Sequence, residues 1–348
     1  MLPFALPAMA GLIVTWLCVR LLLVFAPRMG LVDVPNQRSS HTRPTPRGGG
    51  LAFVVAVPLI ASLASRWMDV PLPEGTRALV AGGLLVAAIG LADDRFRLPA
   101  SVRFGAYLAA ALLLIADGGY LHELQWPGGP GVSLGWIGIP ITIVWIVGLT
   151  NGFNFMDGID GIAATQAVVA AATVALLSSV NGEQGLAIFT AALAGAAGGF
   201  LVHNWPPARI FMGDVGSAFL GYTFAGLAVL TGGRGGSAIP FTLWLILLAP
   251  FLFDTALTLG RRVARGERWY EAHREHLYQR LIGQGWTHLA TTSTYLCADL
   301  YLAGVVAASL FLGLGGIALA VAVMLPLGII YWVVKWAERR GQAPTLQR

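Results

Sequence analysis

Acidic and amide side chains recur at short spacings in this sequence, between long apolar stretches. Asp93 and Asp94 stand side by side where one apolar stretch ends. Adjacent carboxylates repel unless a cation or a proton separates them, and the hard Mg²⁺ ion favours oxygen ligands. The pair therefore predicts a divalent-cation or phosphate site, although a simple charge cluster at a helix end would also explain it.

A second polar segment carries an amide or a carboxylate at every third position. Its members are Asn151, Asn154, Asp157 and Asp160. On a helical segment this spacing places all four side chains on roughly one face. Such a row could hold hydroxyls, a nucleobase or metal-bound water. A helix N-cap is an alternative role for Asp157 or Asp160, but not for all four.

A third acidic position, Asp214, lies at the foot of another apolar stretch, between Gly213 and Gly216. Glycines let the backbone approach a ligand closely, and the N-terminus of a helix favours an anion. This segment is therefore expected to contact a phosphate or its metal. The alternative is that Asp214 only caps the helix that follows.

Basic residues and histidines gather in two further segments. His273 and His276 lie among arginines, and no cysteine or third histidine is near enough to complete a zinc site, so phosphate binding is favoured over metal. His41 and Arg47 precede Gly48–Gly50, a basic loop that leads into a helix start and predicts another anion seat. Contact with lipid head groups is the alternative for that loop.

Composition shows which elements must position these residues. Apolar residues make up 56% of the 348 residues, charged residues 11%, and the mean hydropathy is +0.72, which excludes a soluble globular domain. A span needs about 20 mostly apolar residues. We expect an all-α polytopic membrane protein, one domain over 1–348, with 10–11 transmembrane helices. The predicted spans are 4–27, 48–66, 76–92, 100–116, 132–150, 160–180, 185–203, 215–231, 237–260, 288–312 and 314–335.

The basic residues orient these spans. Seventeen lie in one set of alternate loops together with the C-terminal tail, and three lie in the other set, which predicts a periplasmic N-terminus and a cytoplasmic C-terminus in a bacterial inner membrane. The net charge of +5 is then a topology signal, and no nucleic-acid partner is expected. Five polar loops fall on the predicted cytoplasmic side and should form one site. They are 28–47, 91–99, 151–160, 203–216, which includes Arg209 as a substrate-binding candidate, and 261–287.

Asp254 lies within a predicted span, about six residues or roughly 9 Å from its inner end. Ionisable groups in spans are costly and usually functional, so Asp254 is a substrate-binding candidate, with helix packing as the alternative. A transporter would place polar groups near the midplane in broken helices, often in an internal repeat. We count Asp254 as the only intramembrane acid and find no repeat, so we favour an enzyme.

Together these segments resemble a known family. The matching segments are Asp33–Asn36, Gly48–Gly49, Asp93–Asp94, Asn151–Gly161, Phe211–Ser217 and His273–His276. In this order they resemble the polyprenyl-phosphate N-acetylhexosamine-1-phosphate transferases of glycosyltransferase family 4, to which the phospho-N-acetylmuramoyl-pentapeptide transferase is related. The resemblance implies that undecaprenyl phosphate and a UDP-N-acetylhexosamine give an undecaprenyl-diphosphate-sugar and UMP, with Mg²⁺ or Mn²⁺ as cofactor.

The resemblance also implies roles for single residues. Asp214 would ligate the metal, and Asp94 would approach it. Asp93 and Asp94 would position or deprotonate the lipid phosphate, either for direct attack or through a covalent aspartyl phosphate. The amide and carboxylate row at 151–160 would line the nucleotide-sugar pocket, and His273 and His276 would hold phosphate or sugar. The bilayer supplies lipid partners, and the spans could support a homodimer.

Finer distinctions come from departures within the resemblance. Arg97 stands where the family often has lysine, and the three-histidine run of the pentapeptide branch is missing, which favours the hexosamine branch. Segments 38–41 and 44–49 resemble enzymes that start O-antigen or related surface glycans. N-acetylglucosamine is the expected sugar, with N-acetylfucosamine and N-acetylquinovosamine as alternatives. The segment from Asp157 does not continue as it would in CDP-alcohol phosphotransferases.

Overall fold

The computed structural model describes residues 4–26, 28, 30–34, 44–127, 131–233, 237–267 and 273–341. Helices make up most of this part of the chain. They are α1 (Ala5–Phe25), α2 (Leu51–Met68), α3 (Thr76–Phe96), α4 (Ala100–Ala116), η1 (Gly135–Ile137), α5 (Gly138–Met156), α6 (Ile162–Val180), α7 (Gln184–Asn204), α8 (Asp214–Gly233), α9 (Phe241–Leu247), α10 (Ala249–Ala264), α11 (Leu277–Gly283), α12 (His288–Leu312) and α13 (Gly316–Gly341).

Two short antiparallel hairpins complete the fold. The first pairs β1 (Val32–Asp33) with β2 (Thr45–Pro46), and the second pairs β3 (Glu123–Leu124) with β4 (Val132–Ser133). Among the described residues, nine helices are long and apolar enough to cross a bilayer, and the bent pair α9–α10 makes a tenth. The 17-residue α4 is a shorter apolar helix. The prediction of an all-α polytopic fold is confirmed, and the protein is a multi-pass membrane protein.

Two predicted spans have different bounds in the structure. The span expected at 237–260 is not one helix, because α9 and α10 meet at an angle of 78°. Pro250 lies in the first turn of α10, where its missing N–H cannot continue the preceding helix. The span expected at 132–150 begins later, since Val132 and Ser133 pair with β3, and it runs on to Met156. Part of the segment predicted as a polar loop is therefore helical.

Helix α8 lies at the centre of the bundle and is almost wholly buried, with α3 and α5 packed along it. Small residues allow these helices to approach closely. A Cβ atom added at Gly90 would lie 2.5 Å from the carbonyl oxygen of Asp214, so only glycine fits there. The end of α3 is thereby held against the start of α8, which brings two of the predicted acidic segments together.

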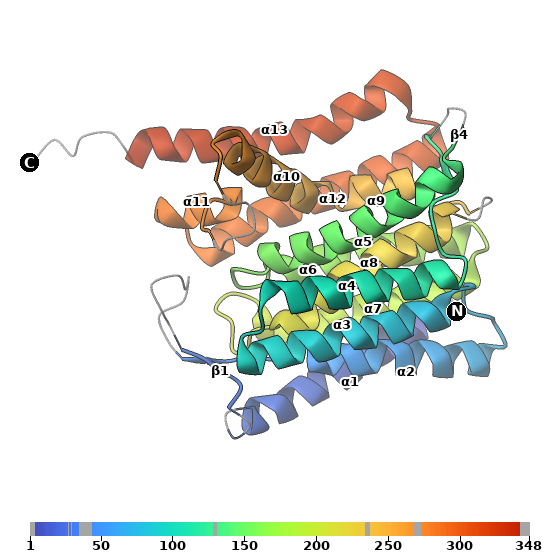
Figure 1. Ribbon diagram of the computed structural model, residues 1–348, viewed down its shortest axis with the longest axis horizontal. Helices are drawn as coiled ribbons and strands as arrows, with labels where there is room; N and C mark the ends of the chain where they lie inside the picture. The colour runs from blue at the N-terminus through green and yellow to red at the C-terminus, as the bar shows by residue number, and fades with distance from the viewer. Residues whose placement is uncertain are drawn as a thin grey trace, which may run out of the picture.

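The polar segments gather at one end of the bundle. Figure 1 shows β1, α11 and the C-terminal end of α13 at the left end, whereas β4 and the N-terminus lie at the right end. This arrangement agrees with the predicted grouping of the polar loops. The assignment of that end to the cytoplasm stays a prediction.

Candidate functional site

An acidic cluster forms where α3 ends and α8 begins. We use this name for the carboxylates of Asp93, Asp94, Asp157 and Asp214 together with the guanidinium groups of Arg47 and Arg103. The cluster joins four segments that are far apart in the sequence.

The carboxylate of Asp94 makes several contacts within the protein. It accepts the backbone N–H groups of Asp214 at 2.9 Å and Val215 at 3.2 Å, and it pairs with Arg47. The anion favoured by the N-terminus of α8 is thus a side chain of the protein itself. The side chain of Asp94 is 0% exposed. Three groups of the protein thus hold Asp94, and the metal contact expected for it stays a prediction.

Asp93 and Asp214 differ in how open they are. Asp93 accepts the Leu98 N–H at 2.6 Å and pairs with Arg103 at 2.9 Å. Asp214 lies 3.7 Å from Arg47 on one side and 3.7 Å from Arg103 on the other. Its side chain is 23% exposed, against 9% for Asp93. Asp214 is therefore the acid of α3 and α8 that is most accessible to a ligand.

Arg47 reaches the cluster because the β1–β2 hairpin holds it there. The N–H groups of Gly49 and Gly50 donate to the carbonyl oxygens of Phe211 and Met212 at 2.9 Å each. These two N–H groups therefore pack two loops together, and the anion site predicted for this segment stays a prediction that rests on the side chain of Arg47. Burial opposes the charge of Arg47, but Asp94 and Asp214 raise the pKa of its guanidinium overall. His41, in the same predicted loop, lies outside the described residues.

The predicted row at 151–160 does not share one face. Asn151 and Asn154 lie on α5, where Asn154 donates to the Ser217 hydroxyl at 2.9 Å and Asn151 donates to the carbonyl of Val147. Asp157 follows the last residue of α5 as its C-cap. Burial, and then the nearby charges of Asp214 and Asp94, raise the pKa of its carboxyl, so we count Asp157 with the acidic cluster. Gly158 follows the end of α5, and a Cβ atom added there would lie 2.0 Å from the hydroxyl oxygen of Tyr278. Gly161, with a left-handed φ of 79°, is the N-cap of α6.

Asp160 turns away from the row. Its carboxylate accepts the Ala208 N–H at 3.0 Å and contacts the His288 ring at 3.1 Å. It is not the N-cap of α6, where Gly161 stands and no side chain caps the helix. In this structure Asp160 holds the segment that leads to Asp214 against the start of α12. It is placed to support the site rather than to line a nucleotide pocket.

The histidine loop, residues 273–278, is anchored by Asp254 of α10. The carboxylate of Asp254 accepts the Leu277 N–H at 2.8 Å and the Tyr295 hydroxyl at 2.7 Å, and it contacts His276 Nδ1 at 3.1 Å. Asp254 is 0% exposed and His276 is 2% exposed. Both residues are therefore placed to position the loop, whereas the sequence analysis expected substrate contacts from them.

His273 is the more open histidine of this loop. It is half-buried, and its Nδ1 atom has no hydrogen-bond partner among the described residues. Burial lowers the pKa of His273 to about 4, with further lowering by His276 and Arg262, so the ring is neutral at physiological pH. The loop also joins the acidic cluster, because Tyr278 donates its hydroxyl to the Phe155 carbonyl at 2.9 Å, just before Asp157.

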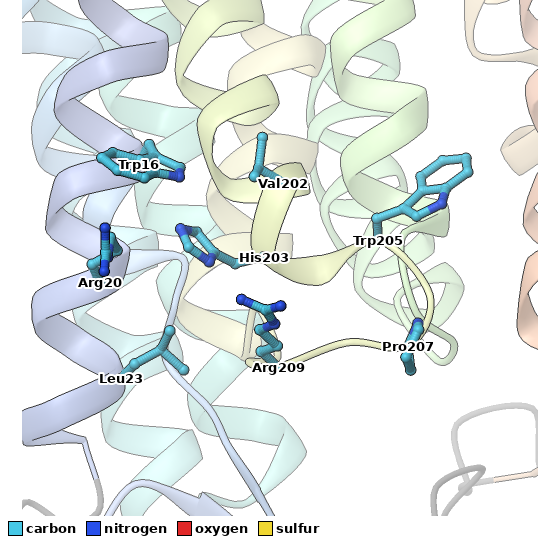
Figure 2. Close-up of a pocket in the computed structure, with 8 residues that line it drawn as sticks. All are labelled: Trp16, Arg20, Leu23, Val202, His203, Trp205, Pro207 and Arg209. Atoms are coloured by element: carbon cyan, nitrogen blue, oxygen red, sulfur yellow. The ribbon is translucent and has the colours of Figure 1, made fainter.

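Arg209 does not join the acidic cluster. It lines a separate pocket between α1 and the end of α7, where Figure 2 shows it with Trp16, Arg20 and His203. None of the acidic-cluster residues lines this pocket. The predicted contact of Arg209 with the substrate is thus not supported by its position.

The described residues do not offer a preformed cage for a metal ion. No group of three or more histidine, cysteine, aspartate or glutamate side chains among them is arranged to hold one. The donors of the acidic cluster are nevertheless hard oxygens, and its four carboxylates face two guanidinium groups. This surplus of negative charge fits a divalent cation that is held by one or two carboxylates and by ligand oxygens.

Several residues of the site were missed at the level of sequence. Arg103 was not among the candidate site residues, although it lies ten residues after Asp93 and the turn between α3 and α4 brings the two together. Tyr295 is 41 residues from Asp254, and nothing in the local sequence connects them. Asp299 is a further buried acid within α12, so Asp254 is not the only intramembrane acid, as we had counted.

Comparison with known proteins gives consistent matches. A family model described as glycosyl transferase family 4 matches residues 76–232. A decaprenyl-phosphate N-acetylglucosaminephosphotransferase of Mycolicibacterium smegmatis is 33% identical, over 96% of this chain and 89% of that protein. The protein of the same description from Mycobacterium tuberculosis is 32% identical, over 82% and 77%. An undecaprenyl-phosphate alpha-N-acetylglucosaminyl 1-phosphate transferase of Escherichia coli strain K12 is 28% identical, over 75% and 72%.

Proposed function

Because the chain belongs to glycosyl transferase family 4, we propose that it transfers N-acetylglucosamine 1-phosphate from a UDP-sugar to a polyprenyl phosphate, with release of UMP. The names of its relatives support both the lipid acceptor and the sugar. The observation that carries the proposal is the position of Asp214, the open acid between two arginines at one end of an apolar bundle. A water-soluble diphosphate and a membrane-bound phosphate can meet there.

In the proposed reaction the lipid phosphate attacks the sugar-proximal phosphorus of the donor. One phosphorus–oxygen bond forms, the bond to the bridging oxygen of UMP breaks, and the electron pair of that bond leaves with UMP. A phosphomonoester has a second pKa near 6, so the acceptor is largely ionised at neutral pH and needs little help from a base. The chief obstacle is repulsion between two anions, which is relieved by cationic groups fixed in place.

The arginines of the acidic cluster supply part of this relief. Arg47 and Arg103 flank Asp214, and each also binds an aspartate of α3, which fixes the direction of its guanidinium. Arginine suits this task, because its planar group binds phosphate oxygens through two parallel hydrogen bonds. Asp93, held by Leu98 and Arg103, keeps that arrangement in place.

We also propose a Mg²⁺ requirement, with Mn²⁺ as a substitute. Asp214 would hold the ion together with diphosphate oxygens of the donor, and Asp157 is the next acid with surplus negative charge around it. When bound, Mg²⁺ supplies charge neutralisation for the diphosphate. Mg²⁺ is usually bound by one or two carboxylates plus substrate phosphates rather than by an all-protein cage.

The histidine loop is proposed to contact the donor from the other side. His273 is neutral and only half-buried, so its ring can exchange a hydrogen bond with a phosphate or sugar oxygen. The many basic residues in the predicted inner loops support a site that faces the cytoplasm from the bacterial inner membrane. The product would then start a lipid-linked surface glycan.

The test is UMP release by the purified full-length protein. It is given undecaprenyl phosphate, Mg²⁺ and, in turn, the UDP derivatives of N-acetylglucosamine, N-acetylfucosamine and N-acetylquinovosamine. We expect UMP only when lipid and donor are both present, and fastest with UDP-N-acetylglucosamine. UMP release that does not depend on the lipid would refute the transfer, and a faster rate with another sugar would refute the choice of donor. A phosphorylated enzyme trapped without lipid would refute direct attack.

A further inference from the structure

A second pocket lies at the same end of the bundle as the histidine loop, between the last turns of α1 and α7. Its volume is about 680 Å³, and Arg20, His203, Arg209, Trp16 and Trp205 line it together with apolar residues. Figure 2 shows the guanidinium groups of Arg20 and Arg209 on either side of the His203 ring. Pockets of this size accommodate small-molecule ligands.

Within the part of the chain that the structure describes, the two arginines of this pocket have no acidic partner. Arg47, Arg103, Arg262, Arg265 and Arg280 all pair with carboxylates. Arg20 and Arg209, by contrast, make no ion pair with any carboxylate of the described residues, and Arg20 instead lies 5.0 Å from the centre of the Trp16 ring. Two unneutralised guanidinium groups that face one cavity favour an anionic ligand.

His203 gives an independent indication of a ligand. It is only 5% exposed, and neither ring nitrogen makes a hydrogen bond of normal geometry with a described residue, although the Trp16 backbone is near. Its ring stacks on Trp16, with 6.1 Å between centroids and 24° between planes. A buried polar group without a partner is costly. A ligand oxygen in the pocket would remove that cost.

The surroundings of the pocket point to the membrane. Along α1, the apolar side chains of Leu17, Leu21 and Val24 are 49%, 60% and 57% exposed, as expected of a surface that faces lipid. Tryptophan and arginine side chains at the end of such a surface are typical of the level of the lipid head groups. We propose that this pocket binds the phosphate group of an anionic membrane lipid, and that the side chains of Arg20, Arg209 and His203 contact that phosphate. The proposal does not depend on the proposed transferase function.

The test is native mass spectrometry of the full-length protein in detergent with three probes. Dioctanoyl-phosphatidylglycerol carries both phosphate and tails, dioctanoylglycerol carries tails alone, and sn-glycerol 3-phosphate carries phosphate alone. The variants are R20Q/R209Q and His203→Phe, which keeps an aromatic ring. The control is Arg66→Gln, because Arg66 is an exposed arginine near the end of another apolar helix and does not line the pocket. The unfolding temperature of each variant is measured without probe.

We expect dioctanoyl-phosphatidylglycerol to bind the wild-type protein and the Arg66→Gln variant with the same affinity. Its affinity for the double variant should be lower by a factor of about ten or more, because charge-assisted hydrogen bonds are lost. His203→Phe should weaken binding while its ring still packs on Trp16. Equal binding by dioctanoylglycerol would overturn the phosphate assignment. Equal affinity for glycerol 3-phosphate would overturn the lipid assignment in favour of a soluble phosphate. Unchanged binding in a folded double variant would overturn the site.

Discussion

The acidic cluster and the histidine loop both centre on an aspartate, but the two aspartates are used in opposite ways. Asp214 faces two arginines at 3.7 Å and repelling carboxylates nearby, and its side chain is 23% exposed. Asp254 is fully buried, and hydroxyl, imidazole and backbone N–H groups occupy its two oxygens. One carboxylate is left accessible to a ligand, whereas the other is enclosed by the protein.

This difference indicates that Asp214 takes part in the reaction, whereas Asp254 supports the structure around the site. An acid that must meet a cation or a phosphate has to retain unsatisfied charge, which costs stability. An acid whose partners are all built into the protein contributes to stability and orients what it binds. The sequence presents Asp214 and Asp254 alike, as acids within or beside apolar stretches. Substitutions at these two aspartates and at residues near them separate the two roles.

Asp214→Asn should lower the rate of UMP release about a thousandfold. Removal of a single group that stabilises charge in the transition state of an enzyme has an effect of this size. The unfolding temperature should stay the same or rise, because the substitution removes repulsion from Asp94 and Asp93. The matched control is Asp69→Asn. Asp69 is exposed beyond the end of α2 and has a left-handed φ of 53°, a conformation that asparagine tolerates. A fully active Asp214→Asn enzyme would remove Asp214 from the chemistry.

Asp254→Asn should act mainly on stability. The change removes the charged carboxylate that accepts hydrogen bonds from Leu277, Tyr278 and Tyr295. A hydrogen bond to a charged group is worth about 1.5–3 kcal/mol. An asparagine can still accept some of these bonds, so part of the stabilisation is retained. We expect a loss of about 2–4 kcal/mol, seen as a lower unfolding temperature, and a reduced rate at temperatures where the histidine loop is loosened. Normal stability with abolished activity would show instead that Asp254 takes part in catalysis.

His273→Gln should lower activity about tenfold without changing its pH dependence between pH 5.5 and 8. The pKa of His273 is lowered to about 4, so the ring is already neutral throughout that range. Because the folded pKa lies below the ordinary value of 6.5, this histidine favours folding fully above pH 6.5 and loses that contribution as the pH falls toward 4. An acidic limb of activity that disappears in the variant would contradict the neutral assignment.

Glu338→Gln should have the smallest effect. Glu338 of α13 pairs with Arg280 of α11, and their side chains are 21% and 19% exposed. Ion pairs near the protein surface are typically worth about 0–1 kcal/mol, and this pair is only partly buried. The unfolding temperature should therefore fall only slightly, and the rate of UMP release should not change. A large loss of activity would mean that α13 orients the histidine loop more strongly than its contacts indicate.

Much of the fold could be predicted from hydropathy, because each span must be about 20 apolar residues long. The break between α9 and α10 could not, since an averaged window does not register a 78° bend. The end of α5 was also misplaced. Polar residues were assigned to a loop, although Asn151 and Asn154 continue the helix as far as Met156.

Most acidic residues of the site could be predicted from the sequence, but the role of each one could not. Asp93, Asp94 and Asp214 were identified correctly as neighbours, because the inner loops of a bundle share one end. Their contacts depend on pairs distant in the sequence, such as Asp94 with the backbone at 214 and 215. Whether an aspartate is open or enclosed is decided by such partners, and no local spacing reports it.

The most direct test of the account is Mn²⁺ binding followed by electron paramagnetic resonance in the presence of UDP-N-acetylglucosamine. The wild-type protein and Asp69→Asn should bind Mn²⁺ with the same affinity, and Asp214→Asn should bind it at least about tenfold more weakly. Asp254→Asn, measured below its unfolding temperature, should bind Mn²⁺ as the wild type does. If Asp254→Asn loses the ion and Asp214→Asn keeps it, the assignment of the open and enclosed aspartates is contradicted.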